Sequence, residues 1–199
     1  MKILGHDNSP YVRKVRIVLE EKRIPYEYVE TKGSQPGSPV PEHNPLSKIP
    51  VLLNDKGKAV YDSPVIVEYL EALVPEPRLI PLELEQRVDV RRWEALGDGI
   101  TDAVVAVSHD YDKVQSAEWH RKQRLKIDRG LAAMAKELAE RDFCYGSRFS
   151  LADIAAGYAL GYLDRMLPDF DWRTPHPNLA RLAERLAQRE SFIKSMPKA

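Results

Sequence analysis

Residues 49–75, IPVLLNDKGKAVYDSPVIVEYLEALVP, combine two kinds of periodicity within one short stretch. The segments IPVLLN and KAVYD are strand-like, and the turn around Asp55 and Gly57 that separates them predicts a β-hairpin. In the segment that follows, apolar residues recur at helical spacing, with Ser63 as the expected N-cap and Pro64 at the first helical position. A hairpin that leads directly into a helix is therefore the local unit around which the chain is organised.

The residues before this stretch also alternate between strand and helix. Residues 2–6 (KILGH) predict a buried strand and residues 26–31 (YEYVET) an alternating one. Between them, residues 10–22 place apolar side chains on one helical face and charged side chains on the other. Ser9 is the expected N-cap of this helix, and Pro10 falls at its first position, where the missing N–H costs nothing.

The segment that joins these two parts, residues 32–50, is rich in Gly, Ser and Pro and predicts irregular structure. Residues 1–80 therefore predict a βαβ–ββα unit. Residues 74–85 carry three prolines and predict a linker. Beyond the linker the pattern is helical only, over the segments 85–111, 117–141, 150–167 and 178–196. The third of these is apolar nearly all round, which indicates a helix buried in the middle of its domain.

The composition narrows the range of partners. Of the 199 residues, 43% are hydrophobic and 30% charged, which is ordinary for a soluble globular protein. Lys plus Arg and Asp plus Glu number 30 each, so the formal net charge is zero. This balance argues against nucleic acid or an anionic membrane as the main partner and favours a small molecule or another protein.

The sequence predicts a cytoplasmic protein. Its start turns polar too soon for a signal peptide, and no apolar run approaches the roughly 20 residues needed to span a bilayer. The single cysteine, Cys144, cannot form an internal disulfide, which suits a reducing compartment. No His pair has metal-ligand spacing, so the sequence predicts no metal site.

Two short motifs allow both a structural and a functional interpretation. Ile49-Pro50 is either an ordinary trans peptide at the end of a loop or a cis peptide that turns the Ile49 backbone outward to pair with an extended ligand. Asp62 and Ser63 either cap a helix only, or hold the ammonium and carboxylate groups of an α-amino acid at its positive end. By contrast, Ser150 with Asp153 three residues later is a capping-box pattern, which we interpret as structural.

The order of these motifs closely resembles that of the cytosolic glutathione S-transferases over essentially the whole chain. A strand leads to Ser-Pro at a helix start, NPLSKIPVL (44–52) enters a hairpin, YDSPVIVEYLE (61–71) forms a helix, and SLADI (150–154) opens the buried helix. The strongest likeness is to bacterial members with Ser-Pro at the first helix start. The resemblance implies a thioredoxin-like, glutathione-binding domain over residues 1–80 and an all-α domain over residues 86–199 that contributes the acceptor-substrate pocket.

The resemblance also assigns roles to the residues that would bind glutathione. Ile49, ahead of a cis Pro50, would make main-chain hydrogen bonds to the cysteinyl part of the tripeptide. Ser63 and its helix N-terminus would receive the γ-glutamyl carboxylate, with Asp62 near the amino group. Lys48 is the candidate for the far end of the peptide, and His43 is a weaker one.

Ser9 would then be the catalytic residue. In the related glutaredoxins the active cysteine stands at this position, so a serine here cannot form a mixed disulfide. A hydroxyl that donates to sulfur at the positive end of a helix would instead favour the glutathione thiolate. Asn8 and Tyr11 are neighbouring donors that could take this role. The acceptor pocket is expected between the domains, with Tyr11, His109 and Tyr111 as candidate lining residues.

These observations lead to the hypothesis of a glutathione transferase that acts on small apolar electrophiles, with a function in detoxification. Glutathione would be the co-substrate, and a homodimer is expected with Leu52, Val60 and Tyr61 near the interface. The alternative is a glutathione-fold protein that binds or regulates a partner without useful catalysis. A cysteine-dependent thiol transferase is disfavoured because position 9 is serine and Cys144 is expected to be packed.

Overall fold

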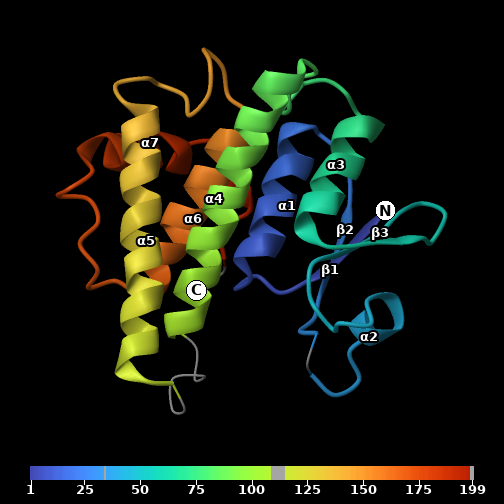
Figure 1. Cartoon of the computed structure of the whole chain (residues 1–199). Helices are drawn as coiled ribbons and strands as arrows, with labels where there is room; N and C mark the ends of the chain where they lie inside the picture. The colour runs from blue at the N-terminus through green and yellow to red at the C-terminus, as the bar shows by residue number, and fades with distance from the viewer. Residues whose placement is uncertain (34, 109–114, 198–199) are drawn as a thin grey trace. The chain divides into compact units, whose positions relative to one another are not determined.

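The computed structural model of the protein describes residues 1–33, 35–108 and 115–197 (Figure 1). The chain forms two compact units. The first contains Met1–Leu79 together with Arg189–Ala199, and the second contains Ile80–Gln188. The C-terminal segment therefore packs with the beginning of the chain, and the second unit is inserted between the two parts of the first.

The first unit is built on a mixed four-stranded sheet. In the order β2-β1-β3-β4, its strands are Glu27–Glu30, Lys2–Gly5, Val51–Leu53 and Ala59–Val60. Strands β1 and β2 are parallel, whereas β1 with β3 and β3 with β4 are antiparallel. Helix α1 (Pro10–Glu21) connects β1 to β2, and helix α3 (Ser63–Leu73) follows β4. This arrangement confirms the βαβ–ββα order and the thioredoxin-like fold class.

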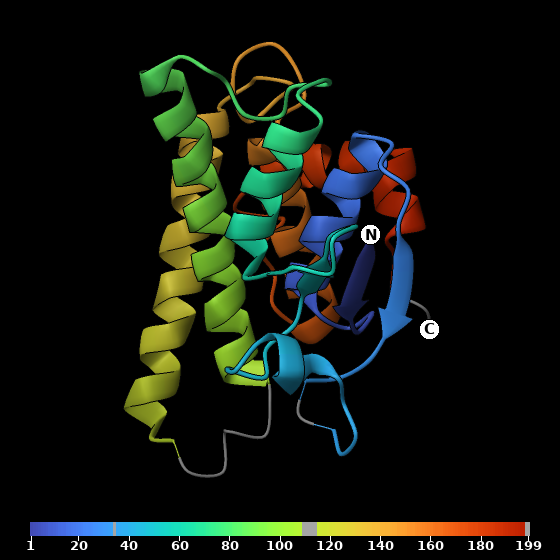
Figure 2. The ribbon, with the colours of Figure 1, turned by 90° about the vertical axis from the view of Figure 1, so that its right-hand side faces the viewer.

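Both faces of this sheet are covered. Leu4 and Val51 are paired across β1 and β3, and they form an apolar cluster with Val40 of the one-turn helix α2 (Val40–His43). Ile3 and Leu52, the next pair along the two strands, point to the opposite face and are fully buried. Helices α1 and α3 contact each other, and Figure 2 shows them side by side.

Helix α1 begins as the sequence predicts. Ser9 is its N-cap with an extended backbone (φ −79°, ψ 121°), and the Ser9 Oγ accepts a hydrogen bond from the Val12 N–H at 3.3 Å. Pro10 occupies the first helical position. The helix ends at Glu21, where the amides of Lys22 and Arg23 donate to carbonyls of its last turn.

The start of α3 differs by one residue from the prediction. Asp62, not Ser63, is the N-cap, and its carbonyl accepts a hydrogen bond from the Ile66 N–H at 2.9 Å. The reason is that Asp62 has an extended backbone (φ −90°), so that helical geometry begins at Ser63. Ser63 is consequently the first helical residue, and Pro64 the second.

The segment 32–50 contains more regular structure than its composition predicts. Val40 and its neighbours form α2 because Val40 becomes fully buried against the sheet. The hairpin turn is as expected: the Asn54 N–H donates to the Lys58 carbonyl at 3.0 Å, and Gly57 adopts a positive φ of 74°.

In the described residues of the second unit, the regular structure is helical. Its helices are α4 (Leu84–Ser108), α5 (Ala117–Leu138), α6 (Leu151–Met166) and α7 (Pro177–Ala187). Helix α6 is buried over most of its length, as its apolar sequence predicts. Gly97 permits a close approach of α4 to α6, because a Cβ atom there would lie 2.7 Å from the Ala155 carbonyl oxygen.

The capping box at the start of α6 is present. The Asp153 carboxylate accepts the backbone N–H of Ser150 at 2.9 Å and the N–H of Cys144 at 2.8 Å, as well as the Ser150 hydroxyl at 3.1 Å. Burial raises the pKa of Asp153, although these donors oppose the shift. The capping box therefore ties the loop before α6 to the helix.

The last predicted helix is divided in two. Helix α7 ends at Ala187, and the short helix α8 (Glu190–Lys194) belongs to the first unit, where it packs against α1. Phe192 of α8 is 2% exposed, so α8 contributes a buried aromatic side chain to the first unit. Across the described parts of the chain, none of the helices has the length and hydropathy that crossing a bilayer requires.

Candidate functional site

The sheet register brings together the three segments predicted to form the site, which contain Ser9, Pro50 and Ser63. They meet at the end of the sheet where β1 and β4 stop and β3 starts. Leu4 near the end of β1 pairs with Val51 at the start of β3, and Leu52 pairs with Val60 at the end of β4. The chain therefore leaves β1 toward Ser9, enters β3 from Pro50, and leaves β4 toward Ser63 at the same end of the sheet. Helices α1 and α3 both start there, so two positive helix ends face the same region.

The first of these segments is the loop between β1 and α1. Ser9 is half-buried, and its N–H donates to the His6 carbonyl at 2.9 Å, while the Asn8 N–H donates to the His6 Nδ1 at 3.1 Å. The Ser9 Oγ uses a lone pair to accept the Val12 N–H, so the cap does not consume the proton of the hydroxyl. This leaves Ser9 able to donate a hydrogen bond to an anion at the helix end.

The second segment contains the cis peptide between Ile49 and Pro50. Pro50 is buried at the entrance to β3, Ile49 is half-buried, and the preceding Lys48 is exposed. Ile49 precedes β3 and lies outside the pairing of β3 with β1 and β4, and a main chain in such a position can pair with an extended peptide. The cis geometry is the one implied by the family resemblance.

Asn44 holds this segment in place, and the sequence analysis did not identify it. Its side chain is 2% exposed. The Asn44 Nδ2 donates to the Lys48 carbonyl at 2.9 Å, and its Oδ1 accepts the Leu46 N–H at 3.0 Å. The available signal was an Asn two residues before the turn at Leu46, because Asn side chains commonly accept a backbone N–H two residues ahead.

Gly33 is a second position that the sequence analysis missed. A Cβ atom at Gly33 would lie 1.8 Å from the Ser47 carbonyl oxygen, so only glycine fits there. Ser47 itself has a positive φ of 53°. The loop after β2 is thus seated directly against the turn that leads to Pro50. A glycine in a Gly-, Ser- and Pro-rich stretch carries no local signal of such a contact.

The third segment is the start of α3. Ser63 is 3% exposed and Asp62 is exposed, and the Tyr61–Asp62 peptide is cis. Within the described residues, the Asp62 carboxylate makes no capping hydrogen bond to the helix. The arrangement places an acidic side chain directly before a helix N-terminus, which can hold a carboxylate.

The remaining candidates are placed as follows. His43 ends α2 and is half-buried, and Tyr11 lies half-buried in the first turn of α1. His109 and Tyr111 lie outside the described residues. Cys144 belongs to the second unit and is fully buried; burial first, and the neighbouring Asp153 second, raise its thiol pKa. Among the described residues, no group of three or more His, Cys, Asp or Glu side chains could hold a metal ion.

Comparison with known proteins identifies the family. The model of the glutathione S-transferase N-terminal domain matches residues 8–73, and that of the C-terminal domain matches residues 117–185. The uncharacterized GST-like protein YibF of Escherichia coli K12 is 37% identical, over 99% of this chain and 98% of its own length. The chain belongs to the glutathione S-transferase family.

Solved structures of other family members share the whole fold. A glutathione S-transferase of Methylobacterium radiotolerans, in complex with glutathione sulfonate, is 46% identical with a TM-score of 0.93, covering 100% of this chain and 95% of its own. A glutathione S-transferase of Methylobacillus flagellatus with GSH bound is 44% identical with a TM-score of 0.95, covering 99% of both chains. Glutathione-type ligands thus bind to close structural relatives of this protein.

Proposed function

We propose that the protein is a glutathione transferase, of the bacterial type with Ser-Pro at the first helix start, that activates glutathione for attack on small, largely apolar electrophiles. The observation that carries the proposal is that the segments with Ser9, the Ile49–Pro50 peptide and Ser63 meet at the same end of the sheet, where β1 and β4 stop and β3 starts. Two related proteins with glutathione or its sulfonate bound support the choice of ligand.

Each part of glutathione has a chemically suitable partner. The Ile49 main chain pairs with the cysteinyl residue, as an added strand would. The N-terminus of α3 with Ser63 receives the γ-glutamyl carboxylate, and Asp62 holds the amino group. Lys48 lies near the glycine carboxylate, and His43 is a further candidate for that end. With glutathione bound in this way, the cysteinyl sulfur would point toward the start of α1.

At the start of α1, Ser9 stabilises the sulfur as thiolate. A thiol with a pKa of about 8.5 is mostly protonated at neutral pH. A depression of two pKa units requires about 2.7 kcal/mol, which one charge-assisted hydrogen bond and the helix dipole can supply together. The thiolate then forms the new sulfur–carbon bond with the electrophile, whose leaving group departs with the electron pair.

Ser9 orients the nucleophile and does not itself attack. Asn8 and Tyr11 are the other donors near the start of α1, and Tyr11 is the candidate lining residue of the acceptor pocket within the described part of the chain. A cytoplasmic homodimer with a role in detoxification is the setting that we expect for this activity.

The test is a titration of bound glutathione that follows thiolate absorbance against pH, in wild type and Ser9→Ala. The proposal predicts a depressed thiol pKa in wild type that Ser9→Ala restores toward its ordinary value. If the pKa stays depressed in Ser9→Ala, Asn8→Ala and Tyr11→Phe identify the donor instead. Binding without thiolate formation would favour a binding or regulatory protein, and absence of binding would refute a glutathione-dependent function.

A further inference from the structure

Arg16 of α1 contacts the loop before its own helix, the residue that precedes β2, and the C-terminal helix α8. Its Nη1 donates to the Asp7 Oδ1 at 2.8 Å, its Nε to the Tyr26 hydroxyl at 3.3 Å, and its Nη2 to the Lys194 carbonyl at 3.0 Å. Its Cζ also lies 4.6 Å from the centroid of the Tyr28 ring. All the nitrogens of the guanidinium are therefore engaged, and the side chain is only 13% exposed.

The Asp7 contact lies next to the residues that would handle the glutathione thiol. Asp7 is 7% exposed and directly precedes Asn8 and Ser9 in the loop between β1 and α1. Its other neighbour, His6, accepts the N–H groups of both Asn8 and Ser9. The ion pair with Arg16 thus fixes the middle of the short segment whose backbone sets the position of the Ser9 hydroxyl.

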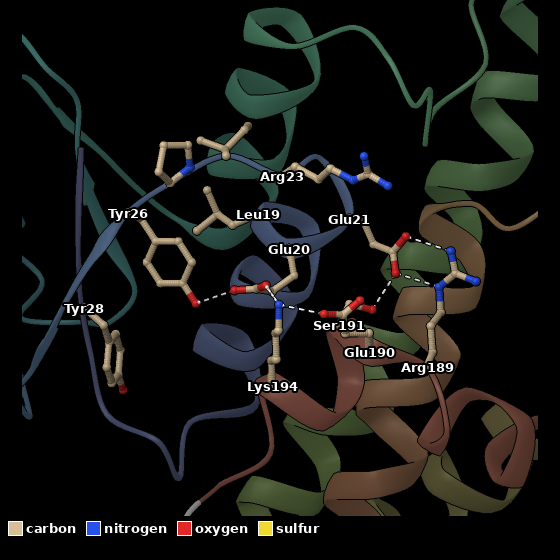
Figure 3. A pocket seen from close by; sticks show the side chains of 12 residues that line it. Leu19, Glu20, Glu21, Arg23, Tyr26, Tyr28, Arg189, Glu190, Ser191 and Lys194 are labelled. Carbon is tan, nitrogen blue, oxygen red and sulfur yellow. Dashed lines mark hydrogen bonds and ion pairs between the residues drawn. The ribbon is translucent and has the colours of Figure 1, made fainter.

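The Lys194 contact depends on a separate set of interactions that anchors α8. Figure 3 shows Arg189 and Ser191 facing Glu21, and Lys194 facing Glu20. The Arg189 Nε and Nη2 donate to the two oxygens of the Glu21 carboxylate at 2.6 and 2.8 Å. These pairs hold the helix whose last carbonyl reaches Arg16.

A groove of about 1010 Å³ lies over these ion pairs, lined by the end of α1, the start of β2, and α8. Its acidic side chains Glu20 and Glu21 are already paired with Lys194 and Arg189, and the Tyr26 hydroxyl donates to Glu20 at 3.3 Å. These acidic side chains therefore already have partners within the protein. We therefore interpret the groove as the outer side of an attachment between α8 and α1.

We propose that Arg16 is a positioning residue that couples the C-terminal helix α8 to the loop carrying Ser9. The proposal rests on the proposed function, because it assumes that this loop activates glutathione. Arginine suits the role since its planar group spans three acceptors in different directions, whereas a lysine ammonium is a single point charge. The stacked Tyr28 ring further restricts the plane of the guanidinium.

The experiment compares Arg16→Lys with Arg189→Lys in the full-length protein. Both variants keep the charge and weaken the attachment of α8, but only Arg16 contacts Asp7. We expect Arg16→Lys to speed backbone hydrogen exchange over residues 6–12 severalfold and to raise the thiol pKa of bound glutathione by about one unit, a tenfold change in the ionisation equilibrium. Arg189→Lys should speed exchange only in the segment from Arg189 onward and leave the thiol pKa unchanged.

Asp7→Ala is an independent test, because it removes the other partner of the Arg16–Asp7 ion pair. It should reproduce the effect of Arg16→Lys, and the double variant should add little to either single change. Unchanged exchange over residues 6–12 in both variants, or equal effects of Arg16→Lys and Arg189→Lys, would overturn the inference. The hydrogen-exchange readout needs no glutathione, so a wild type that fails to ionise glutathione refutes the proposed function while the coupling is still decided.

Discussion

The starts of α1 and α6 use the same residue type for different purposes. Ser150 at α6 is buried; its Oγ accepts the Ala152 N–H at 3.3 Å and its hydroxyl donates to Asp153 at 3.1 Å. Ser9 at α1 is half-buried, and its Oγ accepts the Val12 N–H at 3.3 Å. A serine cap whose donor and acceptor are both consumed is structural. A serine cap whose hydroxyl proton is not used within the protein, at an accessible helix end, can also donate a hydrogen bond to a ligand.

The largest effect should come from Asp153, the acidic partner of Ser150 in the buried cap of α6. Asp153→Ala removes one carboxylate from three donors and leaves the buried N–H groups of Cys144 and Ser150 without it. We expect the free energy of unfolding to fall by about 3–5 kcal/mol, since each unsatisfied buried donor costs roughly 1–3 kcal/mol. Urea denaturation measures this loss. A change below 1 kcal/mol would mean that the α6 cap is not the rigid structural element described above.

A direct comparison of the two serines tests the distinction itself. Ser150→Ala should lower the free energy of unfolding by about 2 kcal/mol, and Ser9→Ala by about 1 kcal/mol, because the latter cap is more exposed. The thiol pKa of bound glutathione should shift in Ser9→Ala alone. The distinction fails if Ser150→Ala shifts that pKa equally under conditions where the variant remains folded.

Asn44 extends the comparison to the turn that leads to Pro50. Like Ser150 it uses both donor and acceptor within the protein, yet it supports the site. We expect Asn44→Ala to weaken glutathione binding about tenfold, equivalent to 1.4 kcal/mol, through displacement of Lys48 and Ile49. The thiol pKa of the glutathione that still binds should stay unchanged. Calorimetric titration gives the affinity, and an unaltered affinity would show that the turn does not depend on Asn44.

The smallest effect concerns Cys144, whose backbone N–H donates to Asp153 of the α6 cap. Burial raises its thiol pKa, so the unfolded chain releases the proton at a lower pH than the folded protein does. Its contribution to stability is therefore complete below about pH 8.5 and is lost as the pH rises above that value, by up to 1.4 kcal/mol per pH unit. Denaturation of wild type and Cys144→Ala between pH 7 and pH 9 measures the difference, which stays below about 1 kcal/mol over this range. Equal pH dependence in both proteins would contradict it.

Local chemistry explains which parts of the fold were predictable. The hairpin turn at Gly57 and the cap at Ser9 depend on residues close together in the sequence, and both were predicted correctly. The N-cap of α3 was wrong by one residue, because Asp62 and Ser63 are both favoured at that position. Val40 forms a helical turn only because the sheet buries it, which no local pattern indicates.

In the candidate site, too, features set by residues close together in the sequence were predictable and those set by tertiary contacts were not. Ser9, Pro50 and Ser63 could be named as candidates because they belong to short motifs, and the sheet register brings their segments to the same end of the strands. Asn44 was missed because its role is to hold a neighbouring carbonyl. The contact between Arg16 and the Lys194 carbonyl joins residues 178 positions apart, so only the folded chain reveals it.

The discontinuous first unit has a consequence for biosynthesis. Helix α8 is translated after the whole second unit, but it packs against α1, which is translated before that unit. The continuous helical unit between them can fold while it emerges from the ribosome. The first unit obtains α8 only after the whole second unit has been translated, so the Arg16–Lys194 contact can form only in a chain that has been synthesised past α8.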